Sequence, residues 1–235
     1  MKKILLAIGI TWLIQMVAIA QNSDKFQIWT DFSPSYNLSE KWRIGGDVGY
    51  RIRLSTKSQT AYIRPGLSFN PSKIINFTVG FANFNSWNPD EFTSAELRTF
   101  QFVVVSWPQI KGFQFKHRIG LEQRWFYLPG FELNKFTPRA RYYLELKSPK
   151  FNLFGMDSPF FLMANFEILR DINQNTIGRL IDHNRYTIGV GNHVSERFRA
   201  EVRLKIINLV DPDINEFVRD IGVLRLRFYY KFGST

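Results

Sequence analysis

Cysteine is absent from the chain, and histidine occurs only three times. The lack of cysteine excludes a disulfide framework, a thiol nucleophile and a cysteine-ligated metal site. The three histidines, His117, His183 and His193, show no H-x-H or H-x-x-x-H spacing, so no histidine metal motif is present. We therefore expect neither a metal nor a cofactor, and we expect hydrogen bonds between strands to hold the fold together.

Long apolar runs are also missing, except at the N-terminus. There, two lysines precede a largely apolar stretch, and Ala18-Ile19-Ala20 is typical of a cleavage site, which predicts a signal peptide over residues 1–20. The alternative, a retained membrane helix, is disfavoured because Gln15 interrupts the stretch. Residues 21–235 then form a single exported domain, since no internal repeat or domain boundary is visible.

Acidic residues are few, with 20 Asp and Glu against 31 Lys and Arg and a formal net charge of +11. The basic residues alternate with apolar ones and form no tail, so the excess belongs to one face of a sheet and not to a nucleic-acid-binding arm. Aromatic residues make up 16% of the chain, with 23 Phe, as expected if many rings contact lipid or lie at its interfaces.

Alternation is clearest from Trp42 to Leu54, where every even position is apolar or Gly and the odd positions include Arg43, Asp47, Arg51 and Arg53. Successive side chains of a strand point to opposite faces, so this segment has one apolar and one charged face. The same pattern recurs along most of the chain. It predicts an all-β fold, a transmembrane antiparallel β-barrel of about 10 to 12 strands in the cell outer membrane, with lipid outside and a charged lumen.

Eleven segments carry the strand pattern, whereas a fully antiparallel closed sheet needs an even number. We therefore expect ten or twelve strands in the closed sheet, with one strand missed or with residues 26–36 in the lumen or only partly paired. The connection 85–95 is among those expected to be long, on the side where such barrels carry extracellular loops. The eleven segments are 26–36, 42–54, 61–70, 75–81, 97–107, 113–126, 139–147, 162–168, 185–191, 198–206 and 221–232.

The last of these segments ends in the lipid-facing aromatic residues Phe228, Tyr230 and Phe232. It resembles the C-terminal strand that the barrel-insertion machinery of the outer membrane recognises. The expected partners are therefore outer-membrane lipid and this machinery, with no nucleic acid, for a barrel that is monomeric.

Four short motifs carry a resemblance to a known family. The stretch His117-Arg118-Ile119-Gly120-Leu121-Glu122-Gln123-Arg124-Trp125 resembles the R-x-x-L-E-Q-R-hydrophobic signature of the DUF2490 family of uncharacterised exported bacterial proteins. Glu96-Leu97-Arg98, Arg139-Ala140-Arg141-Tyr142 and Asn184-Arg185-Tyr186 are also similar to that family. The resemblance implies an outer-membrane β-barrel of a Gram-negative bacterium, commonly of the Bacteroidota, and it implies no activity.

Bases outnumber acids on the faces predicted to point inward. Arginine–carboxylate pairs could brace a narrow interior across neighbouring strands, which is one interpretation. The other is that the surplus of positive charge attracts a small anionic solute or a lipid headgroup. The densest candidate binding cluster comprises Arg118, Glu122, Arg124, Arg139 and Arg141, on two strands joined by one loop.

The sequence thus favours a small channel, a solute-binding barrel or an envelope structural protein. The alternative is an outer-membrane lipid hydrolase, because His117 lies on the apolar face of its strand, where a lipid-facing base would lie. No serine lies near it in the sequence, so we assign no catalytic residue and favour a protein that is not an enzyme.

Overall fold

The computed structural model describes residues 26–130, 132–153, 158–172, 183–210 and 217–233. Within these ranges the secondary structure is all-β, without helices, as the alternating pattern predicts. No helix that could cross a membrane is found among the described residues. The predicted signal peptide, residues 1–20, lies outside the described residues.

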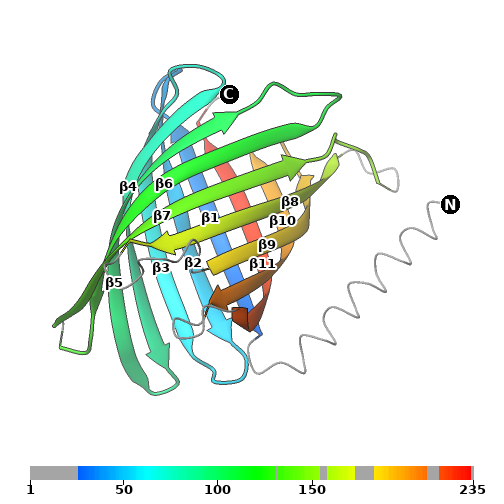
Figure 1. Ribbon diagram of the computed structural model, residues 1–235. Coiled ribbons are helices and arrows are strands. Elements are labelled where there is room, and N and C mark those ends of the chain that lie inside the picture. The colour runs from blue at the N-terminus through cyan, green and yellow to red at the C-terminus, as the bar shows by residue number, and fades with distance from the viewer. Residues whose placement is uncertain (1–25, 131, 154–157, 173–182, 211–216, 234–235) are drawn as a thin grey trace.

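Eleven strands follow one another along the described chain and form one sheet (Figure 1). They are β1 (Gln27–Asn37), β2 (Trp42–Arg53), β3 (Gln59–Phe69), β4 (Ile75–Asn88), β5 (Glu91–Ser106), β6 (Gln114–Tyr127), β7 (Leu133–Lys147), β8 (Phe160–Asp171), β9 (His183–His193), β10 (Phe198–Val210) and β11 (Phe217–Phe232).

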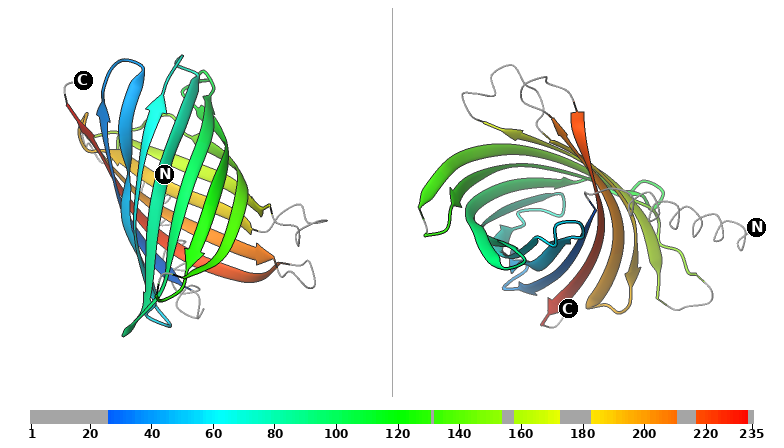
Figure 2. Two further views of the ribbon diagram at one scale, coloured as in Figure 1. Left: turned by 90° about the vertical axis from the view of Figure 1, so that its left-hand side faces the viewer. Right: turned by 90° about the horizontal axis from the view of Figure 1, so that it is seen from below.

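The sheet closes into a barrel through β1 and β11, which are drawn in blue and red in Figures 1 and 2. These two strands pair in parallel, from Gln27 opposite Val223 to Tyr36 opposite Phe232, whereas all other neighbouring strands are antiparallel. The expectation of ten or twelve strands in a purely antiparallel sheet is therefore wrong. One parallel pair allows an odd number of strands to close, and the first segment is a full member of the wall.

The two faces of the wall differ as the alternation predicts. The outer face carries large apolar side chains that are at least half exposed, among them Ile63, Val79, Phe81, Ile119 and Ile188. The inner face carries polar side chains that are at most 5% exposed, among them Asp31, Glu122, Glu167, Glu201 and Arg203. The protein is thus apolar outside and charged inside, the reverse of an ordinary water-soluble domain.

The connection between β4 and β5 is shorter than predicted. β4 ends at Asn88 and β5 begins at Glu91, so the segment 85–95 is a hairpin and not a long loop. β4 extends further than expected because its side chains continue to alternate between the two faces. Phe84 is buried inside the barrel, and the asparagines on either side of it point outward. At the opposite end of the barrel, β7 ends at Lys147 and β8 begins at Phe160, so the connection on that side spans residues 148–159.

Inward-pointing phenylalanine rings lie over glycines of the neighbouring strand at two positions. Phe102 is the cross-strand partner of Gly120, and Phe161 is the partner of Gly191. A Cβ atom at either glycine would overlap the ring. The rings thereby lie flat against the wall, a packing of aromatic residues on glycine that also stabilises curved sheets.

Replacing Gly120 by alanine is expected to lower the free energy of unfolding by about 1–3 kcal/mol, because overpacking forces neighbouring groups out of place. The Phe102 ring cannot move freely, since it stacks on Phe100 with a centroid distance of 5.0 Å and lies 4.7 Å from the Arg118 guanidinium carbon. Urea unfolding of the refolded barrel in detergent measures the effect. Adding Phe102→Leu to Gly120→Ala should restore most of the loss, and failure to do so would contradict the packing.

Candidate functional site

The inner side chains of the barrel enclose a cavity of about 1120 Å³, to which all eleven strands contribute. Its lining reaches from Lys231, near the end of β11, to Leu128, just beyond the end of β6 at the opposite end of the barrel. The lining contains 19 Lys and Arg but only five Asp and Glu. Even when the buried carboxylates behind this surface are included, the wall of the cavity has a large excess of positive charge.

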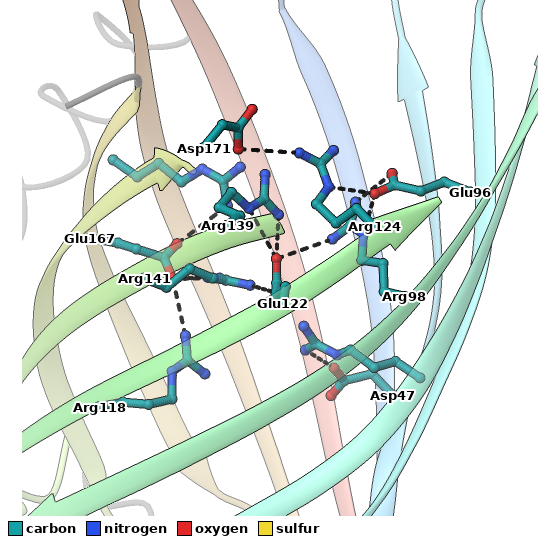
Figure 3. Close-up of polar contacts among 12 residues, drawn as sticks. Asp47, Glu96, Arg98, Arg118, Glu122, Arg124, Arg139, Arg141, Glu167 and Asp171 are labelled. Atoms are coloured by element: carbon teal, nitrogen blue, oxygen red, sulfur yellow. Dashed lines mark hydrogen bonds and ion pairs between the residues drawn. The ribbon is translucent and has the colours of Figure 1, made fainter. Parts of the chain in front are cut away.

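Glu122 on β6 is the centre of the densest group of charges (Figure 3). Arg139, directly opposite it on β7, donates from Nε at 3.0 Å and from Nη2 at 2.5 Å to the carboxylate oxygen Oε2. Arg141 donates from Nη1 to the other oxygen, Oε1. Glu122 is only 2% exposed, so these charge-assisted hydrogen bonds compensate for its removal from water.

Glu167 on β8 continues the network from Arg141. Its Oε1 atom accepts hydrogen bonds from Arg141 and, at 3.0 Å, from Arg118 of β6. Its Oε2 atom accepts a hydrogen bond of 3.2 Å from Arg185 of β9. One buried carboxylate therefore joins arginines of three different strands, and Figure 3 shows this bridge for Arg118 and Arg141.

Arg124 lies in a neighbouring group with acids that we did not include in the predicted cluster. Its Nε atom donates to Glu96 of β5 at 2.5 Å, and its Nη1 atom lies 3.6 Å from Asp171 of β8. Arg98, which faces Arg124 across the β5·β6 pair, binds Glu96 in a two-pronged manner at 2.6 and 2.7 Å. Glu96 thus separates two arginines that would otherwise repel each other.

The five residues of the predicted cluster therefore lie on the inner faces of β6 and β7. Arg98 connects the two groups, because it pairs with Glu96 and its Nη1 atom lies 4.0 Å from Glu122. Analysis of the sequence missed the partners Glu96, Arg98 and Asp171. Strand parity alone could have placed Glu96 and Arg98 inside, because both lie on the inward parity of β5. No local signal gives the contact with Asp171, which comes from β8.

A second buried network joins the two ends of the chain. Asp31 of β1 accepts hydrogen bonds from Tyr62 of β3 and Arg225 of β11. Asp47 of β2 pairs with Arg64 of β3 and, at 2.9 Å, with Arg227 of β11. These contacts connect residues as far apart as 194 positions, so the parallel closing pair is fastened by ion pairs as well as by backbone hydrogen bonds.

The histidines form no catalytic or metal-binding arrangement with the residues that the structure describes. His117 points outward, and its Nδ1 atom lies 2.7 Å from the hydroxyl oxygen of Tyr142, with Trp107 beside it. Its hydrogen-bonding partner among the described residues is thus a phenol and not a serine, so the geometry adds no support for a hydrolase. His183 and His193 line the cavity. In the part of the chain that the structure describes, no group of three or more His, Cys, Asp or Glu could hold a metal ion.

Fold and interior together define a closed, mixed β-barrel with an apolar outer face and a basic, ion-paired inner face. Residues 26–207 match DUF2490, a family of proteins of unknown function, and the chain belongs to this family. No curated protein matches the chain.

Proposed function

We propose that the protein is an outer-membrane barrel whose basic lumen admits small anionic solutes. The observation that carries this proposal is the cavity that runs between opposite ends of the barrel, with 19 basic and five acidic residues in its lining. A wall of one sign of charge in a low-dielectric surrounding concentrates the electrostatic field and raises the local concentration of counter-ions. Anions are the ions that this field favours.

The outer face supports the membrane location. Exposed apolar side chains surround the barrel, and aromatic residues gather near the strand ends, as the pairs Trp42–Phe69 and Tyr230–Phe232 illustrate, with ring centroids 4.7 and 4.6 Å apart. Such aromatic belts are typical of membrane interfaces. In this proposal residues 1–20 direct export, residues 21–235 form one domain, and the insertion machinery recognises the aromatic outer face of β11.

Within this function, the cluster of Arg118, Glu122, Arg124, Arg139 and Arg141 serves mainly to brace the wall. Each of its four arginines has a carboxylate partner, so most of the positive charge of the cluster is neutralised by ion pairs within the protein. Arginine has five N–H donors, however, and those not bonded to carboxylates remain for an anion that passes or binds. Bracing and anion attraction are therefore compatible at this site.

The charge preference of the lumen can be measured in planar bilayers. We expect the refolded residues 21–235 to conduct and, in a KCl gradient, to give a reversal potential with the sign of chloride preference. Arg43→Glu, in the lining of the cavity, should shift the reversal potential toward potassium, because it replaces a positive charge that forms no ion pair with a described residue by a negative one. Lys73→Glu makes the same charge change in an exposed turn outside the lining and should have little effect.

Two results would contradict the proposal. A preference for potassium in the unaltered protein would show that the excess of bases does not set the field in the lumen. A barrel that inserts but does not conduct would leave a purely structural role in the envelope.

A further inference from the structure

Two cations that lie beside Trp29 form no ion pair with any residue that the structure describes. Lys205 of β10 is only 7% exposed, yet it forms no ion pair or hydrogen bond with any described residue. Arg51 of β2 likewise has no ion pair with a described residue, and its Nε atom is buried without an acceptor. Because a buried charge is costly unless it is paired, these two side chains differ from the braced arginines of β6 and β7.

Both cations lie against the same indole ring. The guanidinium carbon of Arg51 is 4.1 Å and the Nζ atom of Lys205 is 5.2 Å from the ring centroid of Trp29, which is 5% exposed. The negative face of an aromatic ring attracts cations, and this attraction holds the two side chains in place. A ring offers no hydrogen-bond acceptor of the strength of an oxyanion, so the donors of Arg51 and Lys205 remain without an acceptor from the part of the chain that the structure describes.

A third cation makes the local imbalance larger. The guanidinium carbon of Arg225 lies 5.5 Å from the centroid of Trp29. Its partner is Asp31, which also binds Tyr62 and lies 3.7 Å from Arg227. Three cations thus surround one ring. Asp31 attracts Arg51 as well as Arg225, and Glu167, which already binds three arginines, attracts Lys205, so the carboxylates of the described residues compensate these charges only in part.

We propose that Arg51 and Lys205, beside Trp29, bind a phosphate group that enters through the lumen. This inference rests on the proposed function and names the class of solute. Two cations without an ion pair to a described carboxylate favour a multiply charged anion, and a phosphate monoester carries a charge of about −1.5 to −2 near neutral pH, with three acceptor oxygens. Arginine and lysine are the usual phosphate-binding side chains, and all three residues line the cavity. Inorganic phosphate and small phosphate esters share this chemistry.

Phosphate binding can be measured through stability, without reference to conduction. A ligand that binds only the folded state raises the unfolding midpoint in proportion to its affinity. For the refolded residues 21–235 in detergent, inorganic phosphate at constant ionic strength should raise the midpoint of thermal unfolding more than chloride or acetate does. Glycerol phosphate as a second probe separates recognition of esters from recognition of the free ion.

Two variants locate the site. Lys205→Met and Arg51→Met should each weaken phosphate binding by about 10-fold or more, since each removes a charge-assisted hydrogen bond. Lys205→Met should also raise the midpoint in the absence of phosphate, because it removes an unpaired buried charge. Lys231→Met is the matched control, since Lys231 lines the cavity but makes no contact with Trp29, and it should bind phosphate as the unaltered protein does.

The outcomes distinguish this site from the channel. Equal stabilisation of the unaltered protein and Lys205→Met by phosphate, or an equal loss in Lys231→Met, would overturn the site and leave only a diffuse field. Chloride selectivity without a specific phosphate effect would overturn the site but retain the proposed function. A specific phosphate effect in a barrel that does not conduct would support the site and overturn the channel.

Discussion

Replacing Glu122 by glutamine is expected to lower the free energy of unfolding by about 3–5 kcal/mol, the usual cost of leaving buried charges without their partner. Glu122 is 2% exposed and binds Arg139 and Arg141, which are themselves 4% and 8% exposed. Glutamine keeps the size of the side chain but removes the negative charge that compensates these two guanidinium groups. Urea unfolding of the refolded barrel in detergent measures the loss.

Glu196→Gln is the matched control. It makes the same chemical change at an exposed residue in the turn between β9 and β10, where the cost should lie within about 0.5 kcal/mol. A double-mutant cycle provides a stricter test. Arg139→Gln should destabilise the unaltered protein but cost much less in the Glu122→Gln background, because the pair that it breaks is already lost. Equal costs in both backgrounds would mean that Arg139 and Glu122 do not depend on each other.

The faces of the strands could be predicted because alternation is a local property. In β2 the odd positions Arg43, Asp47 and Arg51 point inward, and in β6 the same holds for the even positions Arg118, Glu122 and Arg124. The alternation fixes the register, since a shift of one residue would move every charged side chain to the outer face and every apolar one to the inner face. Fold class and the charged interior followed from this rule.

The closing pair could not be predicted, because nothing in β1 or β11 alone gives the direction of the pairing. The parity of β1 places Asp31 on the inner face, but its partner Arg225 is 194 residues away and becomes a neighbour only through the parallel register. The same holds for the contact of Arg124 with Asp171, which joins β6 to β8. Ion pairs between distant strands depend on register and strand order, which local patterns do not contain.

The candidate site could likewise be predicted in part, from the face on which each residue lies, but not in its contacts between strands. Counting charges by parity predicted the basic excess of the lumen and the cluster around Glu122. It could not separate cations that form an ion pair from those, such as Lys205, that form none with a described residue, because this depends on the neighbouring strands. The proposed phosphate site therefore came from the structure, whereas the bracing cluster was visible in the sequence.

The central claim is that one face of this barrel meets lipid and the other meets the aqueous lumen, and adjacent thiols in β4 test it most directly. The protein has no cysteine, so the variants Thr78→Cys and Val79→Cys each carry a single thiol. Thr78 lines the cavity, whereas Val79 lies on the outer face and is 52% exposed. In liposomes, a water-soluble, membrane-impermeant maleimide should label Thr78→Cys and leave Val79→Cys unlabelled, although both react after denaturation. Labelling of Val79→Cys at the rate of Thr78→Cys in intact liposomes would contradict the account.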